Sequence, residues 1–154
     1  MKTTIEQIIT QILNTKDQLG ITLYPGATKE EIKSFERLMN TSLPNDIKKF
    51  YMFCNGFESE EDLFRIIPLD EIIYNRKDEE DNYLLNKQDF HFAEYMIYCD
   101  MWTLTITTSS DNYLIYNKAE TFVTLTDDFA EFLNKFLVGG VFDGLYKWEE
   151  ELKS

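Results

Sequence analysis

The chain has 154 residues, of which 44% are hydrophobic, and its formal net charge is −13 at pH 7. The negative charge is unevenly spread, because residues 1–50 carry 7 basic and 6 acidic residues whereas residues 51–154 carry 8 and 22. Such an acidic segment repels phosphates, which argues against nucleic acid as a partner and favours a basic partner, a cation or simple solubility. At this length one hydrophobic core suffices, and we expect residues 1–154 to form a single domain.

Residues 4–19 are predicted to form an amphipathic helix, because apolar residues recur there at helical spacing and Thr3 with Glu6 makes a capping box. A Pro-Gly turn follows this helix. A second helix is predicted after Thr28, with Glu31 at the reciprocal capping position and an apolar face of its own.

The second helix is expected to end at Asn40, since asparagine tolerates the left-handed conformation that closes a helix. A third helix is predicted to start near Pro44, whose fixed φ and missing N–H suit a first turn, and to close at Asn55 and Gly56. Two capped helices with a short link between them should pack against each other.

From residue 64 onwards the hydrophobic period changes to that of strands. The run 103–107 alternates Leu and Ile with Thr, as a half-buried antiparallel strand does. The other predicted strands or strand-like segments are 63–67, 71–74, 95–99 and the hairpin 113–116 with 121–124. We therefore predict an α+β fold, with N-terminal helices and a C-terminal helix packed on a mainly antiparallel sheet.

The clearest helix of the C-terminal part is predicted after residue 125. Thr126 or Asp127 is the expected cap, Asp128 lies in the first turn, and Gly139 with Gly140 ends the helix. Its apolar stripe should dock on the sheet and consists of Phe129, Phe132, Leu133, Phe136 and Leu137. The tail after these glycines can form one more short helix.

Side chains that carry chemistry are sparse. The only histidine, His91, lies between two phenylalanines, which favours a packed strand residue over a general base or zinc ligand. Cys54 and Cys99 are expected to be buried free thiols. The sequence contains no phosphate loop or nucleophile elbow, so we expect no catalytic residues, cofactor or metal. It also lacks a secretory signal or an apolar membrane span, which predicts a cytoplasmic protein without membrane contact.

Several short motifs occur in a fixed order along the chain. Pro25-Gly26-Ala27-Thr28 precedes a helix that carries Glu36, and Leu43-Pro44 precedes the next, which ends at Asn55-Gly56. Ile67-Pro68-Leu69 and the run 128–133 follow. In this order and spacing the motifs resemble the SUKH superfamily (Smi1/Knr4-like), and the likeness covers roughly residues 20–138. Turns, a helix start and core packing explain the other motif residues, whereas Glu36 has no local explanation in the sequence.

The resemblance implies a bacterial immunity protein that binds and neutralises a cognate toxin. A basic toxin that acts on nucleic acid, such as a nuclease or deaminase domain, fits the charge, because an acidic inhibitor can match the pattern that the substrate presents. Charge alone does not give affinity, so we also expect aromatic residues to anchor the contact, and Tyr95, Tyr113 and Tyr116 are candidates besides Tyr83 and Trp102. The expected partner-binding residues are Glu58, Glu60, Glu61, Asp62, Asp78, Glu79, Glu80, Asp81, Tyr83, Asp100, Trp102 and Asp111.

Two other functions remain open at this point. A regulatory adaptor of the same fold would bind a protein unrelated to any toxin, and a toxin-like neighbouring gene would distinguish the two. A domain that binds a small molecule or a cation would be stabilised by that ligand. Each acidic run can also serve solubility alone, because charge runs are usually solvated.

Overall fold

The computed structural model describes residues 2–78, 84–107, 112–118 and 122–153. The order of elements in these residues is α1 (Ile5–Thr15), β1 (Ile21–Leu23), α2 (Lys29–Met39), α3 (Asn45–Phe53), β2 (Phe57–Ser59), β3 (Phe64–Ile66), α4 (Leu69–Asp78), β4 (Phe90–Tyr95), β5 (Asp100–Ile106), β6 (Tyr113–Lys118), β7 (Phe122–Thr126), α5 (Phe129–Gly139), the π-helix η1 (Gly140–Tyr146) and α6 (Lys147–Lys153).

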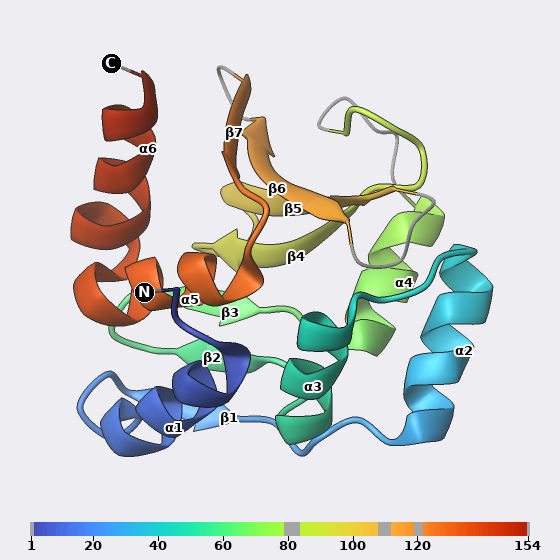
Figure 1. Ribbon diagram of the computed structural model, residues 1–154, viewed down its shortest axis with the longest axis horizontal. Helices are drawn as coiled ribbons and strands as arrows, with labels where there is room; N and C mark the ends of the chain where they lie inside the picture. Colours follow the sequence, from blue (N-terminus) through green and yellow to red (C-terminus); the bar gives the residue numbers. More distant parts are fainter. Residues whose placement is uncertain (1, 79–83, 108–111, 119–121, 154) are drawn as a thin grey trace.

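The strands described here form one sheet in which spatial order follows chain order, from β1 at one edge to β7 at the other. All of its ladders are antiparallel, and the α+β class expected from the sequence is confirmed. In Figure 1, α5 lies against the sheet with α1 and α3 packed beside it, whereas α2 and α4 pack on each other at the opposite side of the molecule.

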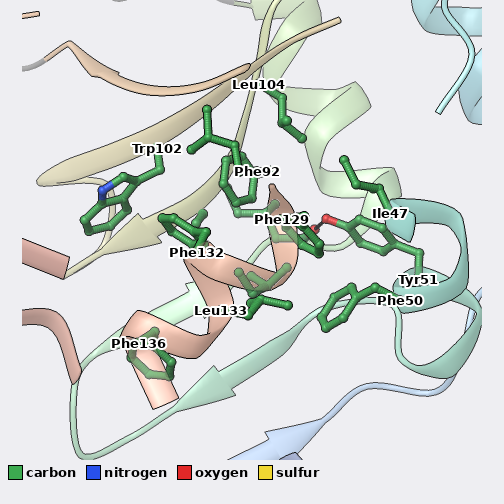
Figure 2. Packing of buried hydrophobic residues seen from close by; sticks show 14 of the residues in the cluster. Ile47, Phe50, Tyr51, Phe92, Trp102, Leu104, Phe129, Phe132, Leu133 and Phe136 are labelled. Atoms are coloured by element: carbon green, nitrogen blue, oxygen red, sulfur yellow. Dashed lines mark hydrogen bonds between the residues drawn. The ribbon is translucent and has the colours of Figure 1, made fainter. Parts of the chain in front are cut away.

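The hydrophobic core lies between α5 and the strands. Side chains alternate along β2 and β3, so that Phe57 and Phe64 face α5 while Glu58 and Arg65 face away. Figure 2 shows Phe132 and Phe136 of α5 among the side chains of the core. The Phe64 and Phe136 rings stack with centroids 4.1 Å apart. Each such buried side chain contributes roughly 1.5–3 kcal/mol, so α5 is firmly attached.

The caps of α2 fall where the sequence predicts them. The Thr28 side chain accepts a hydrogen bond from the Glu31 backbone, and the Glu31 carboxylate accepts one from the Thr28 backbone. Asn40 adopts the left-handed conformation, with φ of 52°. Pro44 directly precedes α3, as expected for a residue that lacks an N–H group.

Two other caps differ from the prediction. The capping box of α1 is formed by Thr4 and Gln7 rather than by Thr3 and Glu6. Thr4 is the last extended residue before the helix, so its hydroxyl is the one that reaches the free N–H groups. Asp128 is the N-cap of α5 rather than a residue of its first turn, because its carboxylate accepts a hydrogen bond from the backbone of Ala130.

Two predicted strands are wrong. Residues 71–74 belong to helix α4, whose first backbone N–H donates to Asn55 Oδ1 at 2.9 Å and whose Leu69 and Ile72 are buried on one face. Strand β4 ends at Tyr95, and residues 96–99 form a turn. Both runs are rich in apolar residues and too short for their period to distinguish strand, helix and turn.

The Pro-Gly motif clamps the segment before α2 onto the end of α3. The Ala27 N–H donates to the Tyr51 carbonyl at 2.8 Å, and the Asn55 N–H donates to the Pro25 carbonyl at 3.1 Å. A Cβ atom on Gly26 would lie 2.1 Å from the Met52 carbonyl oxygen. Only glycine therefore allows the two backbones to come this close.

Candidate protein-binding surface

The face of the sheet opposite α5 carries a network of charged side chains. Glu58, Arg65 and Glu94 are direct cross-strand neighbours on β2, β3 and β4. Arg65 Nε donates to Glu94 Oε2 at 2.8 Å, and Arg65 Nη1 donates to Glu71 Oε1 of α4 at 3.0 Å. The Tyr24 hydroxyl donates to Glu58 Oε2 at 3.2 Å. Arg65 is thus the centre of the network and compensates the buried carboxylate of Glu94.

Tyr98 joins this network from the β4–β5 turn. Its hydroxyl contacts the Glu71 carboxylate and accepts a hydrogen bond from Asn75 Nδ2 at 2.8 Å, while its N–H donates to Glu94 Oε1 at 3.3 Å. Burial, with the Glu71 carboxylate as a further cause, raises the pKa of Tyr98 to about 12. Hydrogen bonding to Arg65 lowers the pKa of Glu71. Near neutral pH, Glu71 is therefore ionised and Tyr98 is neutral, and their hydrogen bonds hold the turn in place.

The turn after β4 has an unusual backbone. Met96, Ile97 and Tyr98 have φ values of 55°, 54° and 62°, and Leu63 in the neighbouring β2–β3 turn has φ of 53°. Single left-handed residues are common only for glycine, asparagine and aspartate, and a branched residue such as isoleucine is strongly disfavoured there. The geometry persists because the surrounding hydrogen bonds fix it.

The side chains at these turns form an exposed apolar cluster, which we call the apolar tip and define as Leu63, Met96, Ile97 and Phe142. Their exposed fractions are 55%, 47%, 89% and 62%. The Met96 N–H donates to the Leu63 carbonyl at 2.8 Å, and the ring of Phe142 lies 5.6 Å from that of Tyr95. Two turns and the π-helix η1 therefore converge, and Figure 1 shows them on the side of the molecule away from α2.

Acidic side chains adjoin the apolar tip. Glu60 and Glu61 are exposed in the β2–β3 turn, and the half-buried Asp62 beside them lies close to Gly140, whose added Cβ would be 2.5 Å from Asp62 Oδ1. Gly140 has φ of 72° and opens the π-helix that presents Phe142. The acids and the exposed aromatic residue are thus held in one arrangement by backbone contacts.

The structure separates the predicted partner-binding residues. Glu58 and Asp100 are half-buried and hydrogen-bonded, Asp100 to Tyr146 at 2.6 Å and to Asn117 at 2.9 Å. Asp78 is the last residue of α4. Tyr83 lies outside the described residues, and so do the remaining predicted acids, which are Glu79, Glu80, Asp81 and Asp111.

Trp102 is a correction to the expected surface. It is fully buried, and its ring packs against Phe64, Phe132 and Tyr146. The further candidates Tyr113 and Tyr116 are buried as well, and they point to opposite faces of the sheet. Alternation along a strand does not reveal which face is covered, so the sequence could not separate core aromatics from exposed ones.

Sequence reasoning missed all four residues of the apolar tip. Met96 and Ile97 fall within the predicted strand 95–99 because their run is apolar, and a branched residue at positive φ has no sequence signal. The double glycine before Phe142 marked the end of α5 correctly, but a π-helix has no recognisable composition. Only the assembled fold brings these residues together.

His91 and Cys54, whose side chains could act as a base or a nucleophile, are both buried in the fold. His91 is buried on β4 with Nδ1 2.6 Å from Thr103 Oγ1, and burial lowers its pKa to about 4. Burial raises the pKa of the Cys54 thiol to about 12. Cys99, contrary to expectation, is exposed in the β4–β5 turn. Among the described residues, no cluster of three or more His, Cys, Asp or Glu side chains has the arrangement of a metal site.

An open cleft of about 800 Å³ lies between the α2–α3 link and β5. Glu36 lines the cleft, but the other lining groups are largely amides and hydroxyls: Asn40, Thr41, Ser42, Asn86, Gln88, Thr105 and Thr107. This cleft is the place where a small polar ligand would bind under the ligand-binding alternative, and it lies apart from the apolar tip.

Comparison with known proteins identifies the family. The model of the SMI1 / KNR4 family (SUKH-1) matches residues 26–135, which is more than half of the chain. Comparison with curated proteins gives no match. In the parts of the chain that the structure covers, no helix is both long and apolar enough to cross a bilayer.

Proposed function

Because this chain belongs to the SMI1 / KNR4 family (SUKH-1), we propose that it is an immunity protein which binds a toxin domain and covers that domain's active site. The partner is a basic protein that acts on nucleic acid, such as a nuclease or a deaminase, and the encounter takes place in the bacterial cytoplasm. The protein itself contributes no catalytic step. Binding alone excludes the substrate.

The observation that carries this proposal is the exposed acidic turn beside the apolar tip. Glu60 and Glu61 extend into solvent, and residues 51–154 as a whole have 14 more acidic than basic residues. An enzyme that binds nucleic acid surrounds its active site with positive charge. The acidic surface presents the same sign of charge as the substrate, and the complementary fields speed association by roughly 10- to 1,000-fold.

Charge attracts the partner, whereas apolar contact retains it. Rim charges mainly change the association rate and its dependence on salt, because water screens exposed pairs. Exposed apolar side chains in the centre of an interface lower the dissociation rate. The acidic turn and the apolar tip are adjacent, so one surface supplies both.

The test is a pull-down of the protein from its own cells at low and at high salt, followed by inhibition assays on the recovered domain. We expect a basic toxin domain, recovered mainly at low salt, whose activity the protein inhibits at one-to-one stoichiometry. Replacing Glu60 and Glu61 by Lys should slow association, whereas replacing the exposed Asp17 of the near-neutral N-terminal part should not.

Two results would contradict the proposal. Recovery of a housekeeping protein without toxic activity would favour the regulatory adaptor. A complex with a basic toxin domain whose association rate is the same at low and high salt would refute the electrostatic part.

A further inference from the structure

The most exposed side chain of the apolar tip is one that the fold itself does not need. Ile97 is 89% exposed, so its side chain contributes little to the core. Its φ of 54° is one that isoleucine rarely adopts, whereas glycine would adopt it without strain. A glycine at this position would therefore favour folding, and isoleucine must serve something other than stability.

The tip is also held rigid. The Met96 N–H bonds to the Leu63 carbonyl, the Cys99 N–H donates to the Tyr95 carbonyl at 2.9 Å, and the Tyr98 hydroxyl is bound to Asn75 and Glu71. A side chain on so well fixed a backbone loses little conformational freedom when it is buried by a partner. Fixing a side chain in its bound position raises affinity because this ordering cost is not incurred on binding.

Local charge identifies the kind of occupant. The three segments that build the tip, residues 60–63, 95–100 and 140–146, contain Glu60, Glu61, Asp62, Asp100 and Asp143 and not one Lys or Arg. A second copy of this chain would bring the same acids face to face, which is unfavourable. A basic surface would compensate them.

We propose that the apolar tip is the anchor of the interface, and that Ile97 with Phe142 inserts into an apolar recess flanked by Lys or Arg on a basic protein partner. This inference rests on the proposed function, because it takes that basic partner to be the toxin domain. The acidic turn meets the cationic rim of the recess, and the tip fills its centre.

The experiment measures binding and folding separately. The probe is the purified basic domain recovered in the pull-down, and the variants are Ile97→Gly, Ile97→Ser and Phe142→Ser. We expect each to weaken binding by about 10- to 100-fold, mostly through faster dissociation. Ile97→Gly should at the same time raise the melting temperature by about 2–4 °C, because strain in the turn is removed. If the role of Ile97 were purely structural, Ile97→Gly would instead lower the melting temperature and leave binding unchanged.

Leu38→Ser is the matched control, because Leu38 is a 57% exposed apolar residue on α2, across the molecule from the tip (Figure 1). It should leave the dissociation constant unchanged. If the domain binds the three tip variants as tightly as the unaltered protein, the anchor is refuted while the proposed function stands. If the unaltered protein captures no basic domain, or an acidic one, the proposed function fails and the anchor fails with it.

Discussion

The Glu36 carboxylate accepts a hydrogen bond from the Leu43 backbone N–H at 2.7 Å. The same oxygen lies 3.5 Å from Lys48 Nζ. Glu36 lies on α2 and Lys48 on α3, so one side chain ties the link between the two helices to both of them. Glu36 was the motif residue without a local explanation in the sequence, and its role here is structural.

We predict that Glu36→Ala lowers the free energy of unfolding by about 1–3 kcal/mol, because the Leu43 N–H loses its charged acceptor. Glu36→Gln should cost less, since an amide oxygen can still accept. Urea denaturation measures both. Lys33→Ala, an exposed substitution on the same helix, should change stability by less than about 0.5 kcal/mol. Equal losses for Glu36→Ala and Lys33→Ala would mean that the bond contributes nothing.

Gly26→Ala should destabilise the fold by more than about 2 kcal/mol, because the new Cβ would collide with the Met52 carbonyl oxygen. A backbone atom cannot move aside as a flexible side chain does. Thermal unfolding measures the effect, and the exposed Lys29→Ala nearby provides the control. An unchanged melting temperature would show that the two segments do not approach as closely as described.

Arg65→Met should cost about 3–5 kcal/mol, because the buried Glu94 carboxylate would lose its compensating charge. The double variant Arg65→Met with Glu94→Gln should recover part of that loss, since the buried charge is removed and only the half-exposed Glu71 carboxylate is left without Arg65. Denaturation of the two single variants and the double variant completes the cycle. Additive losses would show that Arg65 and Glu94 do not interact.

The single histidine allows a direct titration. His91 has a pKa of about 4 in the folded protein, below the value of about 6.5 in an unfolded chain. The unfolded state therefore binds more protons between these values, and stability falls as the pH is lowered from about 6.5 to 4. The loss attributable to His91 is at most about 3 kcal/mol. Ring resonances in NMR spectra should titrate near pH 4, and a midpoint near 6.5 would contradict the burial.

Local signals explain which parts of the fold were predictable. The capping box at Thr28 and Glu31, the left-handed Asn40 and the apolar stripe of α5 involve residues within a few positions of one another. The short strands β1 and β2 were not predicted, because each has three residues and gains its ladder only from distant partners. Helix α4 was missed because its apolar positions also fit a short strand.

The candidate surface was predictable only in its charge. Glu60, Glu61 and Asp62 form an acidic run, and the exposure of Glu60 and Glu61 in a turn follows from its composition. The apolar tip was not predictable, since it depends on Leu63, Met96 and Phe142 meeting across more than 30 residues of sequence on either side of Met96. Trp102 shows the converse error, because an aromatic residue near acids in sequence is buried in space.

The apolar tip combines two turns, which hold Leu63, Met96 and Ile97, with the π-helix η1, which holds Phe142. We expect substitutions at Leu63 or Ile97 to leave strand register and core packing intact, whereas Phe142 also packs against Tyr95 and Tyr146. If the tip is the anchor proposed above, stability and recognition depend largely on different residues, and a few surface substitutions would change the specificity without unfolding the protein. The two turns at residues 60–63 and 96–99 would then offer protein engineers short segments that can be randomised together on an unchanged scaffold.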